Sequence, residues 1–436
     1  MSLYNYTEPR FFRPCDGLGA KASYSLRKLH RNVLNTKAIR VRDDTGAETD
    51  IGFSGQNLDS AGLLAWLGRN QVASVPLGVD SNADGVSDGW SKILGSGNTV
   101  NFTIDQASQK MELSESTTLT YSYARTSTKY VCVAGNTISI TCNAKKISAI
   151  GTVKVLAGFV WRKSDDSIIT TNESEVALTD NADFATKTII LTAPALAGKF
   201  EVHFAITATT IGDTGSAWFK DASATIANQS ATIAKWYDQS GNNNHAIQSD
   251  PTKQPRIVNA GVLDVDASSR ACIQTILAND THLVVADSNT LDFTTNSTYS
   301  FVHNPANFGE GSAGRIIDKG TAYVVNLAST SKLINNATIG GDSSDGCVSF
   351  NSQNVNTILH NDIDDTCKYY SNGSLNAQQT AVTIVVNTTN LYLFNRADLT
   401  RQYNGKFSEL ILFGKTLTDA ERTKLEANQK KYYGVA

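Results

Sequence analysis

Four side chains that offer oxygen ligands alternate between residues 80 and 88. They are Asp80, Asn82, Asp84 and Asp88, and Gly85 stands among them. Calcium-binding loops use alternating oxygen ligands of this kind, with a glycine at the sharp turn. A complete EF-hand loop would need a bidentate glutamate where Ser91 stands, so the spacing predicts the shorter calcium loop of extracellular repeats. The alternative is an acidic linker between domains, whose side chains bond their own backbone.

Three tryptophans are candidates for stacking against a sugar ring, namely Trp90, Trp161 and Trp218. A sugar site on a β-sandwich needs a flat aromatic ring, with Asn, Asp or Gln nearby to bond the hydroxyl groups. The alternative is core packing, which the apolar run VLAGFVWRK favours for Trp161. We expect Trp66 and Trp236 in the core. The sequence therefore predicts carbohydrate-binding residues between positions 76 and 227.

Other chemistries find little support in the sequence. It contains no Gly-x-Ser-x-Gly elbow, phosphate loop or HExxH motif, and its six histidines are scattered. The six cysteines show no CxxC spacing, so a zinc cage is not expected. Cys132 with Cys142, and Cys347 with Cys367, could form disulfides under oxidising conditions; otherwise all six are buried thiols.

Composition predicts an all-β protein. The 436 residues are 41% hydrophobic and 18% charged, and short alternating runs rich in Thr, Ser, Asn and Gly recur along the chain. A net charge of -3 gives no electrostatic attraction to nucleic acid or to an anionic membrane. Because no run approaches the roughly 20 apolar residues that a membrane span needs, we expect no membrane insertion. The amino terminus also lacks the pattern of a signal peptide.

Few helices are expected. Tyr24, Leu26 and Leu29 have helical spacing within residues 22–34, and Asp59 or Ser60 caps a short helix that ends at Gly68. Residues 37–53 read as a hairpin with an Asp-Thr-Gly turn.

The carboxyl terminus also predicts a helix. Thr418 and Glu421 form a capping box, and Ala420, Leu425 and Tyr432 are expected on its buried face.

A sharp corner is predicted where an apolar strand meets residues 238–244. Asp238, Gln239, Ser240 and Gly241 follow Trp236 and Tyr237, and three asparagines come next. These residue types tolerate left-handed backbone and bond nearby main chain. We expect Asp238 to cap the amides of this structural turn.

Several of these stretches resemble a known module. TyrSerLeuArgLysLeu (24–29), AlaIleArgValArg (38–42), AspIleGlyPhe (50–53) and TrpTyrAspGlnSerGlyAsnAsnAsn (236–244) resemble a module of bacteriophage structural proteins. That module is similar to the β-sandwich catalytic domain of fungal-type α-L-arabinofuranosidases. In the phage versions the helix near Leu64 leads almost at once into the TrpTyrAspGlnSerGly strand. Here about 150 residues intervene, which suggests an inserted domain.

The resemblance implies four parts. Residues 1–20, with Phe11 and Phe12, would be an arm that docks on the virion. Residues 21–75 with 228–258 would form the arabinofuranosidase-like module, and residues 76–227 an inserted jelly roll that resembles carbohydrate-binding modules. Residues 259–436 would form a concanavalin A-like or laminin-G-like sandwich, which the TyrSerAsnGly stretch and the final strand and helix resemble.

The functional expectation is a non-enzymatic bacteriophage virion component that binds host-surface glycan for attachment. The arabinofuranosidases cleave with two carboxylates, but no matching acidic motif follows the corner, so no catalytic pair is nominated. The alternatives are a glycoside hydrolase with arabinofuranosidase-like or depolymerase activity, or a purely structural capsid or baseplate decoration without a ligand. Its partners would be other virion proteins and further copies of the chain. Its location would be the virion, which is assembled in the host cytoplasm.

Overall fold

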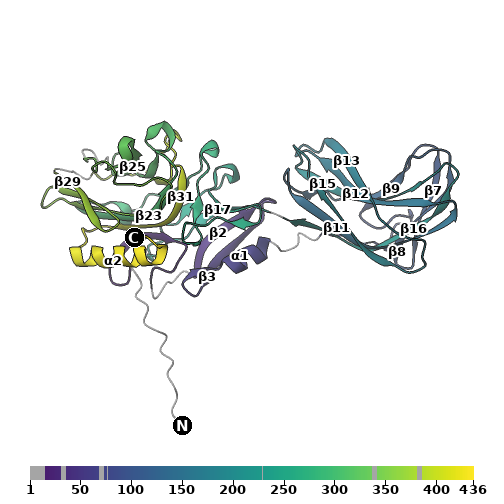
Figure 1. Cartoon of the computed structure of the whole chain (residues 1–436), viewed down its shortest axis with the longest axis horizontal. Coiled ribbons are helices and arrows are strands. Elements are labelled where there is room, and N and C mark those ends of the chain that lie inside the picture. The colour runs from purple at the N-terminus through teal and green to yellow at the C-terminus, as the bar shows by residue number, and fades with distance from the viewer. Residues whose placement is uncertain are drawn as a thin grey trace, which may run out of the picture. The chain divides into compact units, whose positions relative to one another are not determined.

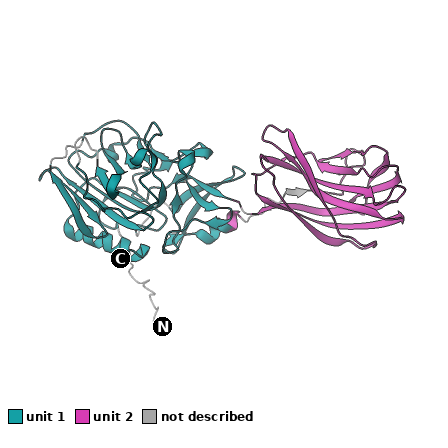
Figure 2. Cartoon of the chain, turned by 45° about the horizontal axis from the view of Figure 1, so that its top comes forward, with its two compact units in different colours: residues 1–64, 230–436 teal, residues 65–229 magenta. Residues whose placement is uncertain are grey.

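The chain folds into two compact units, residues 1–64 with 230–436 (unit 1) and residues 65–229 (unit 2) (Figure 2). The computed structural model describes residues 15–30, 36–67, 73–75, 77–227, 229–335, 341–380 and 385–436. Within these residues strands greatly outnumber helices, which confirms the all-β prediction (Figure 1). Phe11 and Phe12 of the expected docking arm lie outside the described residues.

Unit 1 is built from two antiparallel sheets that hydrogen bonds through β21 connect. The first sheet runs, in spatial order, β1 (Ala20–Ser25), β31 (Gly405–Phe413), β23 (Asn296–Pro305), β27 (Asn354–Asn361), β28 (Thr366–Ser371) and β29 (Ser374–Thr380).

The second sheet runs β26 (Lys332–Asn335), β25 (Val324–Ala328), β24 (Arg315–Asp318), β30 (Leu391–Leu393), β22 (Leu283–Val285), β18 (Ala246–Ile247), β17 (Ala231–Trp236), β2 (Lys37–Asp43), β3 (Glu48–Ser54) and β4 (Asn57–Leu58). β19 (Arg256–Asn259), β20 (Val262–Leu263) and β21 (Ile273–Gln274) complete the unit.

Strands of the expected module and of the expected carboxyl-terminal sandwich pair directly. β1 pairs along its length with β31, so residues 21–75 and 259–436 contribute to one sheet. Unit 1 therefore contains both parts in a single compact body.

The core of unit 1 is aromatic. The ring centroid of Trp236 lies 6.4 Å from that of Phe394 and 6.4 Å from that of Phe407, and all three side chains are fully buried. His303 lies in the same core, with its ring centroid 6.1 Å from Phe407.

Helix α2 (Asp419–Tyr433) packs along the first sheet of unit 1 (Figure 1). The predicted capping box is present, because the Thr418 hydroxyl accepts from the Glu421 amide and the Glu421 carboxylate accepts from the Thr418 amide. The prediction for the buried face was wrong at Ala420, which is exposed. The buried positions instead recur about once per helical turn: Arg422, Leu425, Glu426, Gln429 and Tyr433. Two of them bond to the sheet, Gln429 to Ser300 on β23 and Tyr433 to Glu409 on β31.

The helix expected over residues 22–34 was also wrong where the structure describes it. Residues 20–25 form β1, paired with β31. Ala22, Tyr24 and the alternate residues Ser23 and Ser25 are all buried, so the strand is covered on both faces and shows no polar face. Tertiary pairing overrides the local spacing in such a case.

The other expected local elements are observed. β2 and β3 form the predicted hairpin. Helix α1 (Ser60–Leu67) follows Asp59, whose Oδ1 accepts from the Gly62 amide at 2.9 Å.

Unit 2, residues 65–229, is a sandwich of two facing antiparallel sheets, in agreement with the predicted β-sandwich fold class. One sheet runs β13 (Ile168–Glu175), β12 (Val153–Arg162), β15 (Lys199–Ala208), β9 (Ser122–Thr126) and β6 (Trp90–Ile93), with β10 (Tyr130–Val131) on β15. The other runs β14 (Ala185–Thr192), β11 (Thr137–Ile150), β16 (Thr214–Ala227), β8 (Ser108–Ser116) and β7 (Asn98–Asp105), with β5 (Ala73–Val75) on β16. Alternate side chains of both sheets, including Phe159, Phe204 and Phe219, form one apolar core.

All six cysteines are free and buried, so neither of the two suggested pairs is bridged. Burial raises the pKa of Cys132 and of Cys142 to about 12, which keeps both thiols protonated at neutral pH. In the described part of the chain, neither α-helix has the length and apolar character of a transmembrane segment.

Candidate functional sites

The three predicted sugar-stacking tryptophans lie in unit 2, and all are buried. Trp161 is fully enclosed in the core beside Phe159 and Phe200. Trp90 faces the same core and stacks on Phe204 at a centroid distance of 5.5 Å. Neither ring offers an open face to a ligand, because β12 and β6 turn both side chains inward.

Trp218 points outward from β16 but is covered. Its indole Nε1 donates to Asp105 Oδ2 at 2.8 Å, and the ammonium groups of Lys145 and Lys110 lie 4.7 and 5.4 Å from its ring centroid. Only 7% of the residue is exposed. The ring therefore serves as a cation–π partner within the protein.

The predicted calcium loop is exposed and bonds its own backbone. Asp80 Oδ2 accepts from the Gly85 amide at 2.8 Å, Asp84 Oδ1 accepts from the Val86 amide at 2.9 Å, and Asn82 donates to Asp84. Asp88 accepts from Ser81, whose hydrogen bonds lower the pKa of the Asp88 carboxyl. Among the residues with described positions, no group of three or more His, Cys, Asp or Glu is placed to hold a metal ion. Calcium binding stays a prediction.

The corner at residues 238–244 ties β17 to β1. Asp238 Oδ1 accepts from the amides of Ser23 and Ser240, and its Oδ2 accepts from the Ser240 hydroxyl and the Asn244 amide, all within 3.0 Å. Gln239 donates to the carbonyls of Ser25 and Arg27 at 2.9 Å. Gly241 supplies the left-handed backbone of the turn. With its carboxylate in four hydrogen bonds, Asp238 acts here as a structural residue.

A polar face that sequence reasoning did not select covers the outer side of one sheet of unit 2. We call it the tyrosine face and define it by Tyr121, Tyr123, Arg125, Glu173, Glu201 and His203. β9, β13 and β15 supply these residues, or in the case of Tyr121 the residue just before β9. Their alternate neighbours, such as Ala124, Val202 and Phe204, belong to the core, so the tyrosine face points away from it.

Strand register places these side chains next to one another. Arg125 lies opposite His203, His203 opposite Gly158, and Gly158 opposite Glu173, which makes one row across four strands. Gly158 is required in this row, because a Cβ there would lie 2.1 Å from the Asn172 carbonyl oxygen. With no side chain at Gly158, the side chains of Glu173 and His203 approach each other across this row, to 3.5 Å between Oε2 and Nε2.

The aromatic part of the face is half-buried. The centroids of Tyr121 and Tyr123 are 5.8 Å apart, and that of Tyr123 is 5.4 Å from the His203 ring. Burial, with the adjacent Glu173 carboxylate, raises the pKa of Tyr121 to about 12. The Tyr121 phenol is therefore neutral at physiological pH.

The charged and imidazole side chains of the face have only part of their possible ion pairs and hydrogen bonds. Glu201 pairs with Arg162 at 2.7 Å and lies 3.8 Å from Arg125. His203 Nε2 lies 3.5 Å from Glu173 Oε2, and among the described residues neither ring nitrogen of His203 makes a hydrogen bond. The His203 contact is the main reason why the pKa of Glu173 is lowered. Buried polar atoms in native proteins usually have a partner, so these atoms mark the face as unusual.

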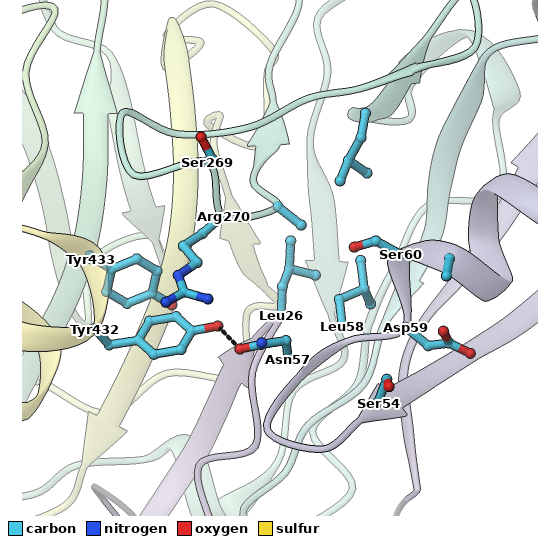
Figure 3. A pocket seen from close by; sticks show the side chains of 13 residues that line it. Leu26, Ser54, Asn57, Leu58, Asp59, Ser60, Ser269, Arg270, Tyr432 and Tyr433 are labelled. Atoms are coloured by element: carbon cyan, nitrogen blue, oxygen red, sulfur yellow. Dashed lines mark hydrogen bonds between the residues drawn. The ribbon is translucent and has the colours of Figure 1, made fainter.

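A second candidate site is a pocket of about 370 Å³ in unit 1. Figure 3 shows Arg270 and Tyr432 on one side, Asp59 and Ser60 on the other, and Leu26 and Leu58 between them. The volume falls in the range of roughly 300–1,000 Å³ that is typical of small-molecule sites.

A buried ion pair fixes the tyrosine side of this pocket. Arg27 Nε and Nη2 donate to Glu409 at 2.7 and 3.1 Å, and Tyr433 Oη donates to the same carboxylate at 3.0 Å. The guanidinium groups of Arg27 and Arg270 lie 4.4 and 4.6 Å from the centroid of the Tyr432 ring. The Tyr432 hydroxyl donates to Asn57 Oδ1 at 2.5 Å.

Comparisons with known proteins identify no family. No protein-family model matches the chain, and no curated protein matches it. Solved structures with similar parts include the binding domain of Paraclostridial Mosquitocidal Protein 1, with 16% identity over 46% of this chain and 50% of that chain, at a TM-score of 0.36.

Two further structures share smaller parts. The enzymatically active domain of bacteriophage CBA120 tailspike protein 4 matches with 14% identity over 32% of this chain and 19% of that chain, at a TM-score of 0.23. The CBM40 of the Ruminococcus gnavus IT-sialidase, bound to α2,3-sialyllactose, matches with 13% identity over 31% of this chain and 83% of that chain, at a TM-score of 0.26. Likenesses of this size do not extend to function.

Proposed function

We propose that this chain is a non-enzymatic glycan-binding protein whose tyrosine face in unit 2 contacts the sugar. The observation that carries the proposal is the combination of two half-buried tyrosines with Arg125 and Glu173 on one outward sheet surface, next to the fully buried His203. A sugar ring presents apolar C–H groups on its faces and hydroxyl groups around its edge. Aromatic rings beside fixed donors and acceptors match both features.

Two features favour binding over hydrolysis on this face. Glycoside hydrolysis needs two carboxyl groups that can act as acid and as nucleophile or base. Glu201 is engaged by Arg162 at 2.7 Å, and it lies across two strand steps from Glu173. The low pKa of Glu173 also makes it a poor proton donor at neutral pH.

A glycan array probed with the full chain tests this proposal. A bound glycan should then lose affinity at least about tenfold in Tyr123→Ala, because aromatic residues central to an interface carry much of its energy. The matched control is Phe184→Ala, since Phe184 is a half-buried aromatic residue beside Lys145 and Lys220 of the opposite sheet. Equal losses in both variants, or no loss in Tyr123→Ala, would contradict the proposal. Release of reducing sugar from the same glycan would support the hydrolase alternative.

We also propose that the chain works on a bacteriophage particle, where it attaches the virion to host-surface glycan together with other virion proteins. The support is the sequence resemblance of residues 24–29 and 236–244 to phage structural proteins. Mass spectrometry of purified particles should find the chain in a fixed copy number per particle. A chain present only in the lysate and absent from washed particles would exclude a virion role. Light scattering of the purified protein tests the predicted homo-oligomer.

A further inference from the structure

Arg270 is the distinctive group in the pocket of unit 1. Within the part of the chain that the structure describes, its guanidinium forms no ion pair and no hydrogen bond, and its Nε is buried. The guanidinium carbon of Arg270 lies 4.6 Å from the centroid of the Tyr432 ring. By contrast, Arg27 on the same ring is fully neutralised by Glu409. The pocket therefore presents a positive charge whose terminal Nη donors form no hydrogen bond among the described residues and could bond a ligand.

The loop that carries Arg270 is held firmly. Asp266 Oδ1 accepts from the amides of Ser268 and Arg270 at 2.8 and 2.9 Å, and the Ser268 hydroxyl donates to the Tyr433 carbonyl at 2.8 Å. The backbone of Arg270 is thus fixed to the end of α2. Binding of a ligand to the guanidinium would therefore cost little conformational entropy in this loop.

The rest of the pocket suits a polyhydroxylated molecule. Asp59 uses Oδ1 to cap α1 through the Gly62 amide. Asp59 and Ser60 lie across the pocket from Arg270, and Asn57 lies beside Tyr432 on the Arg270 side (Figure 3). Short oxygen-bearing groups of this kind bond sugar hydroxyls, and Leu26 and Leu58 offer an apolar surface to a ring.

We propose that this pocket is a second carbohydrate site, separate from the tyrosine face, that takes a sugar unit with a carboxylate group, such as a uronic acid of an acidic polysaccharide. The carboxylate pairs with Arg270, whose planar donors match two carboxylate oxygens. Asp59 accepts hydroxyl hydrogens at the opposite wall, where a second anionic group would be repelled. The site thus selects a ligand with its negative charge at one end.

Titration calorimetry of the full chain with tri-galacturonate and with the neutral galacto-trisaccharide tests the proposal. Wild type should bind the acidic sugar at least about tenfold more tightly than the neutral one, because hydrogen bonds to charged groups are the stronger ones. Arg270→Gln should remove this preference, and Arg270→Lys should retain part of it, since lysine keeps the charge without the planar fork. Raised salt should weaken only the binding of the acidic sugar.

The control variant is Arg396→Gln, because Arg396 is an exposed arginine of the same unit that pairs with Asp398. It should bind as wild type does. Tyr123→Ala should also leave galacturonate binding unchanged, which separates this site from the one proposed on unit 2. An unchanged preference in a folded Arg270→Gln, or no binding of galacturonate by wild type, would overturn the inference. If Arg270→Gln unfolds, Ala61→Tyr at the pocket rim replaces it and should block the acidic sugar.

Discussion

Replacing His303 by glutamine should make unit 1 less sensitive to acid. His303 is fully buried on β23, where Nε2 lies 3.0 Å from Asn356 Oδ1 and Nδ1 lies 3.3 Å from the Tyr403 hydroxyl. A neutral ring with its proton on Nε2 donates to Asn356, and its Nδ1 shares the single hydroxyl hydrogen of Tyr403 with the Lys406 carbonyl, 3.1 Å from that hydroxyl. Burial lowers the pKa of His303 from 6.5 to about 4.

The sign of the effect follows from proton binding. Between about pH 6.5 and pH 4 the unfolded chain binds a proton at this position and the folded chain does not, so stability is lost as the pH falls. From the two pKa values, His303 alone removes about 2 kcal/mol from the free energy of unfolding between pH 7.5 and pH 5. At pH 7.5 both states are neutral, and the residue contributes almost no pH dependence there.

Urea unfolding of the full chain at both pH values measures the effect. Hydrogen-exchange mass spectrometry of peptides from β23 and β31 identifies the transition of unit 1. Other groups titrate in both proteins, so the informative quantity is the difference between wild type and His303→Gln. That difference should shift by about 2 kcal/mol in favour of the variant at pH 5. An identical difference at the two pH values would refute the view that burial keeps this imidazole neutral.

Two further predictions concern charged groups. Arg27→Met should destabilise unit 1 by about 3–5 kcal/mol, because it leaves the Glu409 carboxylate buried without its cation. Arg42→Met breaks the partly exposed pair with Glu48 and should cost under about 1 kcal/mol. Urea unfolding of the two variants measures both free-energy changes. Calcium should bind the full chain with measurable heat, and Asp80→Asn should weaken that binding; a titration without heat in the wild type would remove the predicted calcium loop.

The β-strands were predictable because apolar and polar side chains alternate along them. The hairpin of β2 and β3, the strands of unit 2 and the capping box of α2 all depend on residues close in sequence. The helix prediction failed at residues 20–25 because their structure depends on residues distant in sequence. Their environment is set by β31, nearly four hundred residues away, which buries the serines as well as the apolar side chains.

The candidate sites were harder to predict than the fold. Aromatic type suggested Trp90, Trp161 and Trp218, but the direction in which a ring points depends on strand register, which the sequence alone did not fix. The alternation of Tyr121, Tyr123 and Arg125 was a visible signal of a shared outer face. The pocket of unit 1 combines segments that begin near residues 26, 54, 263 and 432, and no local pattern could bring these together.

The ends of unit 2 are neighbours within their own fold, because β5 at its start pairs with the last third of β16. A domain that begins and ends at one place can be inserted into a host loop at low entropic cost. Residues 65–229 therefore have the form of a cassette that recombination can exchange whole. An exchange of this unit would leave the pairing of β1 with β31 and of β17 with β2 in unit 1 unaltered.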